Sequence, residues 1–136
     1  MVIDSSAVVS ILFGEAEAAS MIDALALPER KLMSSVTRLE SAIVVEARKG
    51  EAGARDLAML MAEASIEVVA FDASQAEVAL DAWRRYGKGQ HPAGLNFGDC
   101  AAYALAAVAH EGLLFKGGDF ARTDVARIDF AATSMP

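Results

Sequence analysis

The sequence is poor in cysteine, histidine and proline. Its 136 residues include one Cys, two His and three Pro. One Cys excludes a disulfide framework and any zinc or iron–sulfur site built on Cys. His91 and His110 lie far apart in the sequence, which argues against a His-rich metal site. Three Pro beside 29 Ala favour helices over an all-β sandwich or barrel.

The sequence also lacks a long apolar run and an excess of positive charge. No apolar stretch approaches the roughly 20 residues of a membrane helix, and no basic region precedes Asp4. We therefore expect no membrane span, no signal peptide and a cytoplasmic location. The formal net charge of -7 argues against a protein that grips nucleic acid by its overall charge. It does not exclude an enzyme whose positive charge is carried by metal ions.

Apolar residues are abundant, at 54% of the chain, and their spacing alternates between two periods. The length predicts a single domain over residues 1–136 whose core needs no disulfide or metal. We expect strands at 2–3, 31–34, 67–71 and 113–115, and a weaker strand at 128–131. We expect helices at 7–13, 15–27, from 36 to a stop at Gly50, and at 54–64, 74–86 and 97–110. This alternation predicts a layered α/β fold with a mainly parallel sheet.

Four carboxylates lie where such a sheet binds ligands, beyond the carboxyl ends of its strands. They are Asp4 after the first strand, Glu40 and Asp99 in first turns of helices, and Asp119 four residues after Phe115. If they converged without fixed cations, they would repel one another unless a divalent ion filled the site. Oxygen ligands suit Mg²⁺ or Mn²⁺, and the natural chemistry of that site is metal-assisted hydrolysis of phosphodiesters.

Two of these carboxylates, Glu40 and Asp99, also have an ordinary structural explanation. Thr37 and Glu40 form a capping-box pattern, and Asn96 and Asp99 resemble the same box. Acidic side chains are also favoured near the positive end of a helix dipole. Asp4 is harder to explain in this way, because a carboxylate buried at a strand end needs a cation or hydrogen-bond donors.

The serines after Asp4 have two interpretations. Ser5 and Ser6 could cap the helix that follows them, or they could bind a metal-bound water. They do not form a nucleophile elbow, because no G-x-S-x-G sequence surrounds them.

Four segments, in order along nearly the whole chain, carry a family resemblance. Residues 1–7 (MVIDSSA) form the first, and residues 38–40 (RLE) contain the second acid. Residues 94–100 (GLNFGDC) contain the third acid, and residues 113–120 (LLFKGGDF), followed by TDV at 123–125, close the set. In sequence and order these segments resemble the motifs of PIN-domain ribonucleases. They resemble most closely the VapC toxins of type II toxin–antitoxin systems.

The resemblance implies a PIN-like three-layer domain and a metal-dependent endoribonuclease that hydrolyses RNA. It implies Asp4, Glu40, Asp99 and Asp119 as catalytic residues and as ligands of Mg²⁺ or Mn²⁺. It also implies a cognate VapB-like antitoxin and a homodimer. In one departure, many relatives carry an acid or Asn where this chain has glycines at 117–118. The fourth ligand therefore rests on Asp119, with Asp124 as a weaker candidate.

Other residues near these motifs have two readings each. The basic cluster of Arg84, Arg85, Lys88 and His91, interleaved with Trp83 and Tyr86, is either an RNA contact or a solvated helix end. Lys116 either contacts the scissile phosphate or flanks the end of a strand. Cys100 lies among Ala residues and is predicted to be a small core residue.

Two other functions compete with the nuclease. One is a catalytically inactive PIN-like module that acts by binding partners, and the intact acidic set argues against it. The other is a phosphatase or phosphoacceptor domain that uses Asp4, but haloacid-dehalogenase enzymes need a second Asp at the position of Ser6. The apolar stretches 36–47 and 54–64 are candidate faces for a dimer or a partner.

Overall fold

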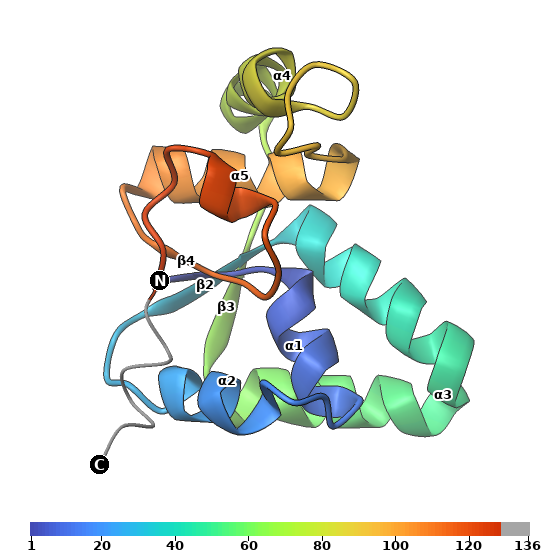
Figure 1. The fold of residues 1–136 in the computed structure, drawn as a ribbon. Helices are drawn as coiled ribbons and strands as arrows, with labels where there is room; N and C mark the ends of the chain where they lie inside the picture. The colour runs from blue at the N-terminus through green and yellow to red at the C-terminus, as the bar shows by residue number, and fades with distance from the viewer. Residues whose placement is uncertain (129–136) are drawn as a thin grey trace.

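Four parallel strands form the centre of the molecule (Figure 1). In the computed structural model, which describes residues 1–128, they are β1 (Val2–Ile3), β2 (Lys31–Ser34), β3 (Ile66–Val69) and β4 (Leu113–Leu114). They pair in the order β3-β2-β1-β4, and every pair is parallel. Parallel strands need long crossover connections, and the helices between the strands provide them.

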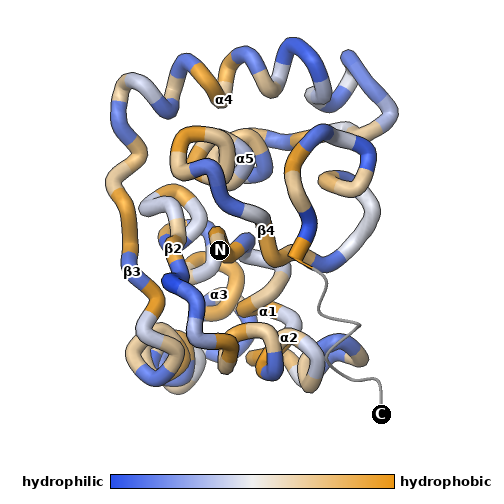
Figure 2. Tube along the Cα trace, turned by 90° about the vertical axis from the view of Figure 1, so that its left-hand side faces the viewer, coloured by the Kyte–Doolittle hydropathy of each residue, from blue (hydrophilic) through white to orange (hydrophobic). Residues whose placement is uncertain are grey.

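The helices cover both faces of this sheet (Figures 1 and 2). They are α1 (Ser5–Leu12), α2 (Ala18–Leu25), α3 (Ser35–Glu63), α4 (Ala73–Tyr86) and α5 (Phe97–Ala109), followed by a short 3-10 turn, η1 (Phe120–Arg122). Helices α4 and α5 lie on one face, while α1, α2 and the second half of α3 lie on the other. The predicted α/β fold with a parallel sheet between helices is confirmed.

The two cores follow from the alternation of side chains along each strand. Val2, Leu32 and Leu113 pack with α4 and α5, whereas their chain neighbours Ile3, Met33 and Leu114 pack with α1, α2 and α3. Successive residues of a strand point to opposite faces, so a strand buried on both sides must be apolar throughout. This explains why β1 (VI) and β4 (LL), whose residues are all buried, are hydrophobic throughout.

Several predicted boundaries differ from the structure. The helix predicted at 15–27 begins only at Ala18, which leaves Glu15 and Glu17 in the preceding turn. The stop predicted at Gly50 is, by contrast, confirmed: α3 consists of two helical halves that meet in a kink, where Gly50 has φ 60 and ψ -149. That backbone conformation is essentially restricted to glycine. The strand predicted at 67–71 covers Ile66–Val69 instead.

The end of the described chain also differs from expectation. Ile128 is not part of a strand, although its backbone N–H donates to the carbonyl of Leu113 at 3.1 Å. Residues 129–131, the rest of the predicted strand, lie outside the described residues. None of the helices in residues 1–128 combines the length and the apolarity that a membrane span requires.

Candidate active site

The N-terminal ends of α1, α3 and α5 lie at the carboxyl edge of the sheet (Figure 1), and a carboxylate lies at or near each of them. Asp4 caps α1, Glu40 lies in α3 and Asp99 lies in the first turn of α5. Asp119 follows β4 and directly precedes η1. The charges of Asp4, Glu40 and Asp119 all raise the pKa of Asp99. The structure therefore brings together the four acidic residues that the sequence singles out.

Asp4 is the most buried of these residues, with 3% of its surface exposed. Its Oδ2 accepts a bond from the backbone N–H of Ser6 at 3.0 Å and another from the Ser6 hydroxyl at 2.6 Å. Its Oδ1 is buried and has no hydrogen-bond partner within residues 1–128. Burial raises the pKa of Asp4 and the charge of Glu40 adds to this, while the Ser6 bonds oppose it. An unpartnered buried carboxylate oxygen is costly, and a cation would remove that cost.

Of the two interpretations of Ser5 and Ser6, the one in which they cap α1 is wrong. Asp4 itself is the N-cap residue, and Ser6 donates to it. The Ser6 oxygen also accepts a bond from the backbone N–H of Lys116 at 2.9 Å. Ser6 therefore holds one oxygen of Asp4 in place and ties it to the chain that follows β4.

Glu40 reaches across to α5 at a glycine. A Cβ atom placed on Gly98 would lie 2.3 Å from Glu40 Oε2, so only glycine leaves room for this carboxylate. The capping box expected from Thr37 and Glu40 was wrong, because α3 begins earlier. Its N-cap is Ser34, whose side-chain oxygen accepts from the backbone N–H of Val36 at 3.2 Å. Capping therefore does not explain why an acidic residue stands at position 40.

Asp99 takes part in the capping box that the sequence predicts. The backbone N–H of Asn96 donates to Asp99 Oδ2 at 3.1 Å, and the backbone N–H of Asp99 donates to Asn96 Oδ1 at 2.9 Å. These bonds fix the orientation of the carboxyl group. Burial is the largest cause that raises the pKa of Asp99 to about 6, followed by the charges of its acidic neighbours.

The donor set consists of carboxylate oxygens, which hard divalent cations prefer. The buried, unpartnered Oδ1 of Asp4 and the mutual repulsion around Asp99 both fit such an ion. Within residues 1–128, no group of three or more His, Cys, Asp or Glu side chains is arranged to hold a metal ion. Ion binding would therefore require side-chain rotations that bring the carboxylates closer, which repulsion opposes until the ion is bound.

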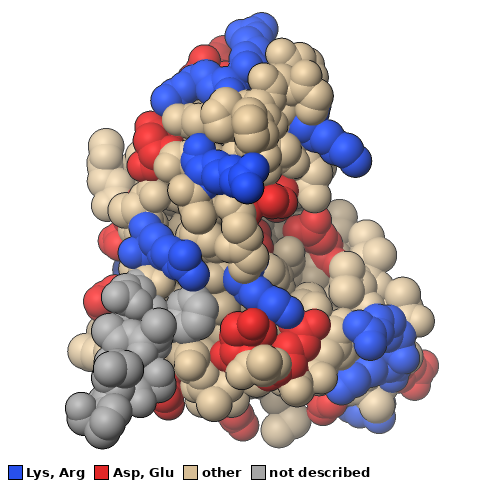
Figure 3. Space-filling model, in the orientation of Figure 1, with Lys and Arg blue, Asp and Glu red and all other residues tan. Residues whose placement is uncertain are grey.

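Lys116 lies beside this site but is already paired. Its ammonium group lies 2.8 Å from Glu15 Oε1 and 3.5 Å from Glu17 Oε2. The bond to Glu15 is the largest cause that raises the pKa of Lys116. Figure 3 shows acidic side chains in a hollow on this face of the molecule, with basic side chains on its border. The pairing with the α1–α2 turn was missed, because a helix was expected to begin at residue 15.

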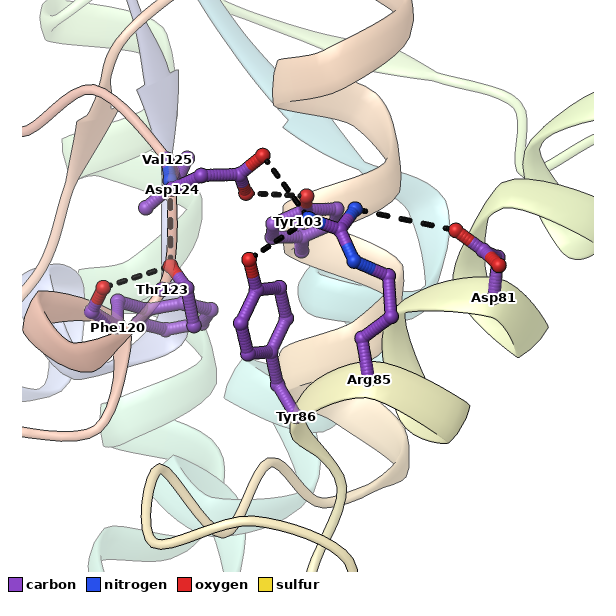
Figure 4. Close-up of polar contacts among 8 residues, drawn as sticks. All are labelled: Asp81, Arg85, Tyr86, Tyr103, Phe120, Thr123, Asp124 and Val125. Carbon is purple, nitrogen blue, oxygen red and sulfur yellow. Dashed lines mark hydrogen bonds and ion pairs between the residues drawn. The ribbon is translucent and has the colours of Figure 1, made fainter.

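The basic cluster at the end of α4 divides into bound and exposed groups. Arg85 contacts Asp81, Tyr86 and Asp124 (Figure 4). The ring of Tyr86 packs against those of His91 and Tyr103, whereas Trp83 is 42% exposed. The cluster is therefore partly structural, and an RNA contact by its exposed members stays a prediction.

Cys100 is a core residue, as predicted. It is buried on α5, and burial raises the pKa of its thiol to about 11. A thiol with that pKa is not a thiolate nucleophile near neutral pH.

Comparisons with known proteins agree with this geometry. Residues 1–126 match the PIN domain family. The chain is 52% identical over 128 residues to a protein named Ribonuclease VapC from Mycolicibacterium smegmatis, with 94% of this chain and 99% of the relative covered. This chain belongs to the VapC ribonucleases of the PIN-domain family. The four acidic residues described above thus belong to a VapC chain.

Solved VapC structures share the fold. VapC20 of Mycobacterium tuberculosis, described as a toxin that cleaves the sarcin–ricin loop, superposes with a TM-score of 0.76 at 17% identity, covering 93% of this chain and 97% of that one. A toxin–antitoxin complex from Klebsiella pneumoniae superposes with a TM-score of 0.67 at 19% identity, covering 90% and 92%. Toxin–antitoxin complexes are thus among the structural neighbours of this VapC chain.

The raised pKa of Asp99 predicts how stability depends on pH. The folded carboxyl group has a pKa of about 6, against 3.8 for an unperturbed Asp, so the folded state holds its proton to higher pH. Stability is therefore greatest below the lower pKa and decreases as the pH rises through the higher one. We expect the Tm of the metal-free protein in EDTA to fall as the pH rises from about 4 to about 6.5, the range that spans the two pKa values.

The Asp99→Asn variant should lose less stability over the same pH range, because Asn can accept the bond from the Asn96 backbone without a charge. Asp56→Asn, at an exposed position on α3, is the matched control and should behave like the parent protein. An equal fall in Tm for all three proteins would contradict the assignment of this pH dependence to Asp99.

Proposed function

We propose that the chain is a Mg²⁺- or Mn²⁺-dependent endoribonuclease that hydrolyses RNA at the site formed by Asp4, Glu40, Asp99 and Asp119. The observation that carries this proposal is the buried Asp4, with one oxygen lacking a described partner, among three further carboxylates. When bound, the metal would supply an activated water and stabilise the charge that develops on the scissile phosphate. A relative that is 52% identical and is named a ribonuclease supports the same activity.

The protein residues have distinct roles in this proposal. Ser6 holds Asp4 Oδ2 with two hydrogen bonds, which leaves Oδ1 without a described partner and able to bind an ion. The capping box at Asn96 orients Asp99, and the missing side chain of Gly98 makes room for Glu40. Asp119, an exposed residue, completes the acidic set and would be a further ligand of the ion.

A cleavage assay tests the proposed function. The purified, antitoxin-free chain is incubated with total bacterial RNA in Mg²⁺, Mn²⁺ or EDTA. We expect discrete fragments that require the metal, and sequencing of their ends would identify the substrate. The same RNA pattern with and without metal would favour the alternative, a catalytically inactive PIN-like module that binds partners.

We also propose that a cognate VapB-like antitoxin neutralises the chain in the cytoplasm, and that residues 1–136 act as one PIN-like domain. The Klebsiella complex of the same fold supports an antitoxin. A peptide arm with a basic residue would complement the acidic site and could replace the ion. Co-expression with the antitoxin, followed by loss of cleavage and copurification of the two chains, tests this partner.

A homodimer is the second partner proposal, and an exposed apolar face supports it. Phe97, Leu39 and Ile43 are 78%, 62% and 60% exposed, and they border a 240 Å³ pocket beside Glu40. Exposed apolar residues in one patch mark interaction surfaces. Met59, by contrast, is exposed while Met61 is buried, so the stretch 54–64 offers a smaller face. Light scattering of the parent chain and of Ile43→Asp tests whether a second copy covers the larger face.

A further inference from the structure

Two glycines separate Asp119 from Lys116, whose backbone N–H is held by the Ser6 oxygen at 2.9 Å. Gly117 has φ +100, and a Cβ on either Gly117 or Gly118 would meet no described atom within 4 Å. These glycines therefore leave the backbone before Asp119 free to adopt more than one course. Contacts after Asp119 in the chain therefore also bear on its position.

Residues 119–125, here called the closing turn, are held together internally. Phe120 is buried and its ring packs on that of Phe115 at 5.2 Å. The Thr123 hydroxyl donates to the Phe120 carbonyl at 2.7 Å and accepts from the backbone N–H of Val125 at 3.2 Å (Figure 4). The closing turn is therefore expected to behave as one rigid segment, and Asp119 is its first residue.

Asp124 fastens the closing turn to two helices (Figure 4). Its Oδ1 accepts a short bond of 2.5 Å from the Tyr103 hydroxyl of α5, and its Oδ2 lies 3.4 Å from Arg85 of α4. Tyr103 is buried, whereas Arg85 and Asp124 are about half exposed. The bond to Tyr103 is therefore the stronger tie, because exposed ion pairs contribute little.

Tyr103 and Asp99 are four residues apart on α5, so they lie on the same side of the helix, one turn from each other. We propose that Asp124 is a positioning residue. Its hydrogen bond to Tyr103 holds the closing turn against α5, and this sets the position of Asp119 relative to Asp99. This inference rests on the proposed metal site and adds a residue that acts through Asp119 rather than on the ion. The charge of Asp119 is among the causes that raise the pKa of Asp99, which is consistent with this arrangement.

Tyr103→Phe tests the inference, because it removes the hydroxyl and leaves the ring in the core. In the metal-free protein, amide hydrogen exchange should accelerate across residues 117–123 and stay unchanged in α5. The affinity for Mn²⁺, measured by calorimetry in the absence of RNA, should fall by about tenfold. This is the usual effect of losing a residue that positions a metal ligand. Asp124→Asn keeps an acceptor for Tyr103 and should weaken Mn²⁺ binding less than Asp124→Ala.

The decisive comparison uses the Asp119→Asn background. If Tyr103 and Asp124 act through Asp119, Tyr103→Phe should cause no further loss of Mn²⁺ affinity there. An equal further loss would overturn the inference, and so would unchanged exchange and affinity in the single variant. Tyr86→Phe is the matched control, since its hydroxyl contacts Arg85 and it should behave like the parent protein.

The same titration separates this inference from the proposed function. If Asp4→Asn and Asp99→Asn leave Mn²⁺ binding intact, the proposed metal site is wrong and the positioning role falls with it. If both variants abolish Mn²⁺ binding while Tyr103→Phe leaves it unchanged, the metal site stands and only the positioning role is overturned.

Discussion

The Asp99→Asn protein is expected to cleave RNA about 10²–10³-fold more slowly than the parent chain, the usual effect of losing one group that stabilises developing charge. Asn lacks the negative charge that a divalent ion would bind. It can still accept the bond from the Asn96 backbone, so the first turn of α5 should stay folded. Initial cleavage rates in saturating Mn²⁺ measure the effect.

The same substitution should make the metal-free protein more stable near neutral pH. The charged Asp99 is opposed by burial and by three acidic neighbours, so a neutral side chain should add about 1–2 kcal/mol to the free energy of unfolding. Opposite changes in activity and stability are typical of residues kept for function. A variant with full activity, or with lower stability at every pH, would contradict the role given to Asp99. Asp56→Asn is the control for both measurements.

The Gly98→Ala protein is expected to stay folded and lose at least about tenfold in cleavage rate, comparable to disturbing the support of a metal ligand. The new Cβ would lie 2.3 Å from Glu40 Oε2 and 2.8 Å from the Glu40 carboxyl carbon. The carboxyl group ends a flexible side chain, so it should move away while both helices keep their positions. Ala is also the better helix former, so the Tm should not fall.

Gly53→Ala provides the contrast for Gly98→Ala. Its Cβ would lie 2.6 Å from the Lys49 Cβ and 2.8 Å from a methyl carbon of Val45, close to the backbone of α3. Neither contact can be relieved by moving the end of a long side chain. This variant should therefore lose stability but keep the activity of each folded molecule. If Gly98→Ala instead lowered the Tm and kept its activity, Glu40 would not depend on the space at position 98.

The two predictions examine different parts of one arrangement. Asp99 tests whether the charge at the site is needed, and Gly98 tests whether Glu40 must occupy the place that the structure shows. An inactive partner-binding module would show no metal-dependent cleavage, either in the parent chain or in the two variants. Loss of cleavage in both variants would exclude that alternative.

Local sequence was sufficient to predict most of the secondary structure. The apolar run at 31–34 predicts β2, and the Asn96–Asp99 capping box with its Ala-rich continuation predicts α5. Signals of this kind act between residues a few positions apart, so they can be recognised in the sequence alone. Errors occurred where two local signals competed: Thr37 and Glu40 fit a capping box, but Ser34 begins the helix earlier.

The sequence by itself determined the α/β order, the family resemblance and the four acidic residues, because each depends on residue type and spacing along the chain. Only the tertiary structure decided which side chains at and around the site contact one another. It set Glu40 against Gly98, Lys116 against Glu15, and Asp124 against Tyr103. Asp124 and Tyr103 are 21 positions apart in the sequence, and Lys116 and Glu15 are 101 positions apart. Such contacts depend on how helices pack on both faces of the sheet, and no local pattern encodes that packing.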